Sequence, residues 1–168
     1  MKKPIPLAYL ITFTCYGTHL QGNAHGSVDK GHRAYGTPFA VANPRRERAN
    51  RRQMKAPEYK MGKVSRGVLL AVLREHCSVR GWTLFAAHVR STHVHFVVAA
   101  EESPERILNE VKAYATRALK RSGAEPEHPK RWTPHGSTRY LWQPEHVGAA
   151  VHYVLREQGE PMAAWERP

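Results

Sequence analysis

The chain has 168 residues, a length that favours one compact domain spanning 1–168. Lys and Arg total 26 against 14 Asp and Glu, so the formal net charge is 26 − 14 = +12, which indicates a polyanionic partner. An apolar fraction of 41 % is too high for a disordered basic tail. No apolar run approaches the ~18 residues of a membrane helix, so we expect no membrane partner. Cys15 and Cys77 cannot form a disulfide framework, so we expect a cytoplasmic location.

The hydrophobic pattern predicts an α+β fold. In chain order, the expected elements are a strand over 8–16, a helix over 64–80, strands over 82–90 and 93–99, a helix over about 104–121, a short strand over 137–142, and a last helix that begins at Pro144 and is ended by Gly159 and Pro161. This order is a ferredoxin-like split βαβ arrangement with an antiparallel sheet and an added C-terminal helix.

A long insertion, at about 17–63, separates the first strand from the first helix. Its first part, to about Pro44, contains five glycines and is expected to be irregular. Residues 45–63 carry eight Lys or Arg against two Glu, so 8 − 2 = +6, which is half of the net charge. Two interpretations stand equally: a solvated, mobile loop, or an arm that contacts phosphate groups.

The motif His93-Val94-His95 opens the most apolar of the predicted strands. Side chains two residues apart project from the same face of a strand, so the two imidazoles can bind one divalent ion while Val94 turns into the core. An isolated His-x-His is more often a pair of surface or hydrogen-bonded histidines. A metal with an open coordination position would explain a paired polar face in this apolar context.

A tyrosine with polar neighbours lies on the last predicted helix. Tyr153 and Glu157 are four residues apart and share a helix face, whereas Gln158 is roughly 140° away in an ideal helix. A helical tyrosine is usually half-buried packing. Beside a metal, however, Tyr153 becomes a candidate nucleophile.

Taken together, these features resemble the single-tyrosine HUH transposases, and among them the REP-associated tyrosine transposases. The specific part of the resemblance is the His-hydrophobe-His strand followed some sixty residues later by a helix-borne tyrosine. The similarity covers most of the chain: 9–18, the Gly26-Ser-Val-Asp29 segment, 89–98, 111–117, 137–142 and 153–155.

The resemblance implies a site and a reaction. His93 and His95 match the pair that holds Mg²⁺ or Mn²⁺, and Tyr153 matches the tyrosine that attacks a phosphate of single-stranded DNA, leaving a 5′-phosphotyrosine link and a free 3′-hydroxyl. The family often places Gln or Asn four residues after the tyrosine as a third ligand. Here that position is Glu157, which helix geometry favours, and Gln158 would need a distorted last turn, so both stay candidates.

The resemblance also implies the partners. The expected substrate is hairpin-forming single-stranded DNA, and because the family can supply the tyrosine helix from a partner subunit, a homodimer is expected. The candidate DNA-binding residues are basic side chains of the insertion and of the helix over 104–121: Arg45, Arg46, Arg48, Arg51, Arg52, Lys112 and Arg117.

Two other functions remain open at this stage. The first is a non-catalytic, basic nucleic-acid-binding ferredoxin-like domain, which would give no reason for the histidine pair and Tyr153 to coexist. The second is a metal-dependent hydrolase that uses a metal-bound water. Such a hydrolase would form no covalent protein–DNA species, whereas the tyrosine mechanism must form one.

Overall fold

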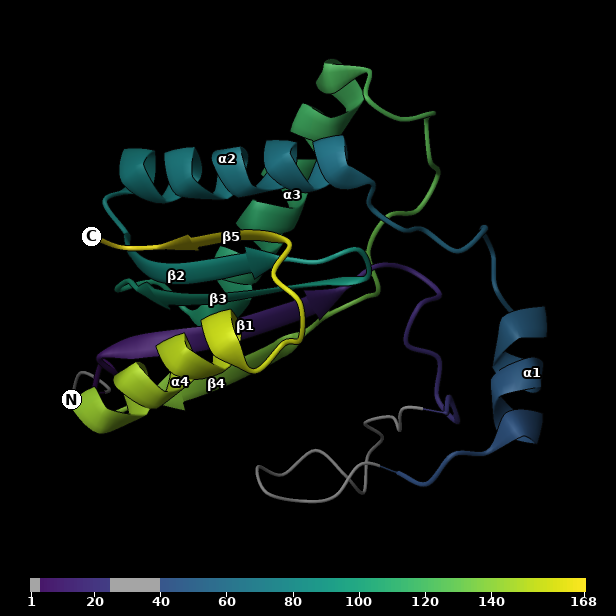
Figure 1. The fold of residues 1–168 in the computed structure, drawn as a ribbon, viewed down its shortest axis with the longest axis horizontal. Coiled ribbons are helices and arrows are strands. Elements are labelled where there is room, and N and C mark those ends of the chain that lie inside the picture. Colours follow the sequence, from purple (N-terminus) through teal and green to yellow (C-terminus); the bar gives the residue numbers. More distant parts are fainter. Residues whose placement is uncertain (1–3, 25–39) are drawn as a thin grey trace.

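The computed structural model describes residues 4–24 and 40–168, and its centre is a five-stranded sheet (Figure 1). The strands are β1 (Ala8–Thr14), β2 (Thr83–Val89), β3 (His93–Ala99), β4 (Ser137–Leu141) and β5 (Ala163–Glu166). They are ordered β4-β1-β3-β2-β5, and every neighbouring pair is antiparallel. The first four strands, with α2 and α3 between them, confirm the predicted α+β, ferredoxin-like fold.

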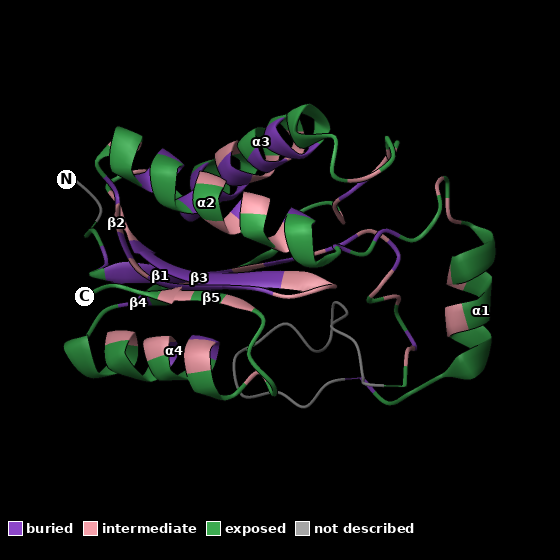
Figure 2. Cartoon of the chain, turned by 45° about the horizontal axis from the view of Figure 1, so that its top comes forward, coloured by how far each residue is buried: buried purple, intermediate pink, exposed green. Residues whose placement is uncertain are grey.

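Helices cover both faces of this sheet (Figure 2). The helices α2 (Lys63–Arg80) and α3 (Pro104–Ser122) lie on one face, and α4 (Pro144–Arg156) lies on the other. Because side chains alternate along each strand, the sheet contributes to two separate apolar clusters. Phe13, Val94 and Phe96 belong to the larger cluster under α2 and α3, while Leu10 and Val97 belong to the smaller one under α4. No helix among the described residues has both the length and the apolar character needed to cross a bilayer.

One helix was not predicted, since 45–63 was expected to be a loop or an arm. The helix α1 (Pro44–Arg52) begins at Asn43, whose side chain accepts a hydrogen bond from the Arg46 amide at 3.1 Å, and Pro44 occupies its first position. It contains no buried residue and so has no apolar stripe from which a helix could be inferred. The expected irregular part of the insertion, and the Gly26–Asp29 segment of the resemblance, lie largely or wholly in 25–39, outside the described residues.

The C-terminal end also differs from the expectation. Helix α4 ends at Arg156 rather than near Gly159, because Glu157 leaves the helical backbone conformation (φ −108°, ψ 16°). The strand β5, which was not predicted, then pairs with β2. Four residues are too short to show a periodic pattern, so this strand depends on the available edge of β2.

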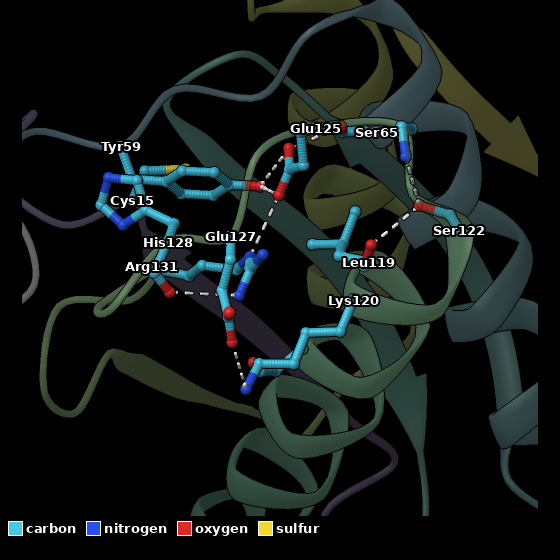
Figure 3. A network of polar contacts seen from close by, with 12 residues as sticks. Cys15, Tyr59, Ser65, Leu119, Lys120, Ser122, Glu125, Glu127, His128 and Arg131 are labelled. Atoms are coloured by element: carbon cyan, nitrogen blue, oxygen red, sulfur yellow. Dashed lines mark hydrogen bonds and ion pairs between the residues drawn. The ribbon is translucent and has the colours of Figure 1, made fainter.

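A buried ion pair within the loop after α3 is hydrogen-bonded to the start of α2 and to the segment before it (Figure 3). Arg131 Nε donates to Glu125 Oε1 at 3.0 Å, and the two side chains are only 2 % and 12 % exposed. Tyr59 and Ser65 donate their hydroxyl protons to the same carboxylate, the latter at 2.6 Å. The backbone carbonyl of Arg131 accepts from the Tyr16 amide at 2.8 Å, so the network also anchors the chain that leaves β1.

We expect Arg131→Met to lower the free energy of unfolding by about 3–5 kcal/mol, because it leaves the Glu125 carboxylate buried without its cationic partner. Urea denaturation measures this loss. The matched control is Arg51→Met, which removes an exposed pair with Glu47 on α1 and should cost less than about 0.5 kcal/mol. Equal losses in the two variants would contradict a structural role for the buried pair.

Candidate metal and nucleophile site

The two histidines of β3 lie together on the α4 side of the sheet. Val94 between them is fully buried in the opposite cluster, as the alternation predicts. The rings of His93 and His95 have centroids 4.6 Å apart, and His95 is only 6 % exposed. The strand therefore presents two neighbouring imidazoles on one surface.

Both imidazoles are neutral at pH 7. Burial, followed by the neighbouring His19, lowers the pKa of His93 to about 4. Burial, followed by His93, lowers the pKa of His95 to about 3. A neutral imidazole keeps the nitrogen lone pair that a metal ion requires.

Threonine hydroxyls orient both rings. Thr12 Oγ1 lies 2.7 Å from His95 Nδ1, and Thr92 Oγ1 lies 3.0 Å from His93 Nδ1. With each Nδ1 held by a hydroxyl, Nε2 is the nitrogen of each ring that remains for another partner. Hydrogen bonds of this kind commonly orient metal-binding histidines.

Tyr153 lies near the C-terminal end of α4 and faces the histidines. Its ring packs edge-on against His95, with centroids 5.6 Å apart. The side chain is still 38 % exposed, so one part of the ring contacts the site while another meets solvent. The predicted tyrosine and the predicted histidine pair, about sixty residues apart in sequence, are thus brought together within one chain.

The two candidates for a third ligand lie differently. The Gln158 side chain lies close enough to His93 and His95 to act on both rings, where its polar group opposes the effect of burial and raises the pKa of each. Its Nε2 donates to the Tyr153 carbonyl at 3.3 Å. Glu157 is exposed, and its Oε1 lies 3.0 Å from Nδ1 of His152. Since α4 ends at Arg156, helical spacing does not fix the direction of the Gln158 side chain.

The donor set suits a divalent cation. Two neutral imidazoles and the nearby amide of Gln158 are neutral donors of the kind that a divalent cation accepts, and solvent or a substrate oxygen can complete the coordination shell. Within 4–24 and 40–168, no group of three or more His, Cys, Asp or Glu side chains is placed to hold a metal ion.

Five predicted DNA contacts lie on α1, which stands beyond the end of the sheet where β1 ends and β3 begins (Figure 1). All five arginines are exposed, and two have polar partners: Arg51 pairs with Glu47, and Arg46 donates to Gln21 at 2.6 Å. Gln21 follows His19 by two residues, and the His19 ring packs against His93 with centroids 5.5 Å apart. The chain that anchors α1 therefore passes directly beside the histidine pair.

The other two predicted DNA contacts lie on α3, across the sheet from α4. The Lys112 ammonium group donates to the backbone carbonyls of Thr133 and His135, and burial lowers its pKa to about 8. The Arg117 guanidinium lies 4.4 Å from the ring centroid of Tyr114. These two cations are thus separated from the histidine pair by the sheet.

Two histidines at this site, His19 and His88, are not among the residues predicted from the sequence. His19 lies in the insertion, where no pattern gives its position. His88 could have been found, because only two residues separate the predicted strands 82–90 and 93–99, and so short a connection sets the register that pairs His88 with His95.

Comparison with models of known protein families finds no match, and none of the curated protein sequences compared matches this chain either. Two of the solved structures that are similar to this chain are described as transposases. One is a REP-associated tyrosine transposase bound to a REP hairpin: 10 % identity, 94 % of this chain and 69 % of that chain covered, TM-score 0.50. The other is described as a “putative transposase” from Deinococcus radiodurans R1: 18 % identity, 94 % and 98 % covered, TM-score 0.45. The first similarity shows that the chain has the fold of that transposase, the fold that the sequence resemblance implied.

Proposed function

We propose that this protein is a metal-dependent single-stranded DNA endonuclease and transposase, which cleaves and rejoins DNA through a 5′-phosphotyrosine intermediate. One observation carries the proposal: the Tyr153 ring packs against His95, whose own ring lies beside that of His93. The Gln158 side chain lies near both histidines and raises the pKa of each. A tyrosine nucleophile and three neutral donors for a hard cation are the parts that such a reaction needs. The fold shared with the REP-associated transposase supports the same conclusion.

His93, His95 and Gln158 would hold Mg²⁺ or Mn²⁺, and the exposed part of Tyr153 would meet the DNA strand. When bound, the cation supplies electrostatic stabilisation of the phosphate charge that develops during transfer. The Tyr153 oxygen loses its proton to solvent and bonds to phosphorus, and the bond from phosphorus to the 3′-oxygen breaks. That oxygen takes up a proton and becomes a free 3′-hydroxyl. The covalent link conserves the phosphodiester, so the strand can be rejoined by the reverse steps without a nucleotide cofactor.

The proposed substrate is single-stranded DNA that forms a hairpin, on the model of the REP hairpin bound by the similar transposase. The five exposed arginines of α1 would contact its phosphates, because the anchor of α1 lies beside the histidine pair. Lys112 and Arg117 would contribute only if the strand also passed the opposite face of the sheet. The homodimer stays a prediction, which sedimentation of the full chain tests.

Tyr153→Phe is expected to abolish cleavage of a single-stranded hairpin, since it removes the attacking oxygen, while DNA binding is retained. A protein–DNA adduct that survives a denaturing gel is the measurement. The control is Tyr140→Phe, another exposed tyrosine, on the edge strand β4 and 44 % exposed, which should leave the adduct unchanged. Cleavage by Tyr153→Phe would contradict the assignment, and cleavage by the wild type without any adduct would favour a metal-bound water.

Gln158→Ala should weaken Mn²⁺ binding by about 10–100-fold, because it removes one of three proposed donors. Glu157→Ala is the matched control and should change the affinity less than about twofold, since its carboxylate lies beside His152. Calorimetry or Mn²⁺ electron paramagnetic resonance, without DNA, measures both. A larger effect of Glu157→Ala would instead identify Glu157, four residues after Tyr153, as the third ligand.

Replacing Arg45, Arg48 and Arg52 together with Ala should lower the affinity for single-stranded DNA by about tenfold, and each lost phosphate contact should reduce the salt slope by about 0.7. Fluorescence anisotropy over a series of salt concentrations measures both quantities. The comparison variant, Arg117→Ala with Arg121→Ala on α3, is expected to have a smaller effect. A larger loss of affinity in the α3 variant would instead place the DNA strand on the face of the sheet covered by α2 and α3.

A further inference from the structure

A third histidine is buried behind the proposed site. His88 on β2 is paired directly with His95 on β3, and none of its surface is exposed. Its ring points to α4 rather than to the histidine pair, because Nδ1 lies 3.0 Å from the backbone carbonyl oxygen of Val154. The other ring nitrogen, Nε2, accepts a hydrogen bond from the backbone amide of Met162, also at 3.0 Å.

These two partners determine the protonation of His88. A backbone N–H can only donate, so Nε2 must be the nitrogen without a proton. A carbonyl oxygen can only accept, so Nδ1 must carry the proton. The ring is therefore a neutral imidazole in one tautomer. Its two nitrogens bond to main-chain groups of Val154 and Met162, which lie on either side of Glu157 and Gln158 in the sequence.

The two hydrogen bonds hold the ends of one short connection. Val154 lies in the last turn of α4, where carbonyl groups lack partners within the helix, and His88 satisfies one of them. Met162 immediately precedes β5, whose first residue, Ala163, pairs with Val89. Between these ends, Arg90 donates to the Glu160 carbonyl at 2.9 Å. The connection that carries Gln158 is thus attached at three points to His88 on β2 and to Arg90, the residue after β2.

We propose that His88 is a positioning residue, which holds Tyr153 and Gln158 over His93 and His95 through its bonds to Val154 and Met162. Tyr153 directly precedes Val154, and Gln158 lies between the two attachment points, so displacement of either bond moves a group of the proposed site. The expected effect of His88 on cleavage rests on the proposed function. Its expected effect on the position of the connection between α4 and β5 does not.

The test compares two buried histidines. His88→Leu removes both main-chain bonds. His76→Leu is the matched control, because His76 is also buried (6 % exposed) and bonded to a polar partner, Glu110, but on the α2 and α3 side of the sheet. In single-turnover cleavage with saturating Mg²⁺, His88→Leu should slow adduct formation by about 100-fold, the cost typical of a small misplacement of reacting groups. The Kd for uncleaved single-stranded DNA should change less than twofold, and His76→Leu should leave both values near those of the wild type.

A conservative replacement separates positioning from general destabilisation. In His88→Asn the amide nitrogen takes the place of Nδ1 and can still donate to Val154, so this variant should recover at least tenfold of the lost rate. If His88→Leu does not fold, His88→Asn replaces it in the comparison with the wild type and His76→Leu. Equal rate losses in His88→Leu and His76→Leu, a parallel loss of DNA affinity, or no recovery in His88→Asn would overturn the proposal.

Hydrogen exchange supplies a readout that does not depend on cleavage. In His88→Leu, the backbone amides of Glu157 and Met162, which donate to the Tyr153 carbonyl and to His88 in the wild type, should exchange at least tenfold faster, while those of α2 and α3 keep their protection. Unchanged exchange at these two amides would refute the positioning role even if cleavage were slow. A wild type that forms no adduct would instead refute the proposed function, and the exchange result would still decide the role of His88.

Discussion

The register of β3 between β1 and β2 is the constraint on which the rest of the proposed site depends. Because β3 is hydrogen-bonded on both sides, a slip of one residue would turn His93 and His95 into the apolar cluster under α2 and α3. The same register places Thr12 on one side of His95 and His88 on the other. One neighbour orients the histidine ring, and the other holds the helix that carries the tyrosine.

The two faces of the sheet have different tasks. The larger cluster, under α2 and α3, contains most of the large buried side chains, and the buried pair of Glu125 and Arg131 extends its support to the chain leaving β1. The smaller cluster, under α4, is built mainly from Ala, Val and Leu. Apolar contact of this kind is non-directional and does not specify the position of the helix end closely. Directional bonds from the sheet, such as those of His88, supply that specificity.

The sequence was informative where a pattern is local and periodic. Strand β3 was predicted with its observed bounds, and the order of elements led to the ferredoxin-like fold, because alternation and helical spacing are properties of a few consecutive residues. Helix α1 was missed because it has no buried face, and β5 because it forms only against β2. The end of α4 was placed too late, since the helical backbone breaks at Glu157, before the helix-stopping residues Gly159 and Pro161.

The sequence by itself determined which groups are available: an alternating histidine pair, a helical tyrosine, two polar side chains after it and an excess of positive charge. Only the tertiary structure decided which of them meet. Gln158, rather than Glu157, lies against the histidines because the helix ends early, and Lys112 is occupied by backbone carbonyls on the far side of the sheet. The physical reason is that spacing along a helix or strand is set by neighbouring residues, whereas contact between elements is set by packing and by hydrogen bonds between residues distant in sequence.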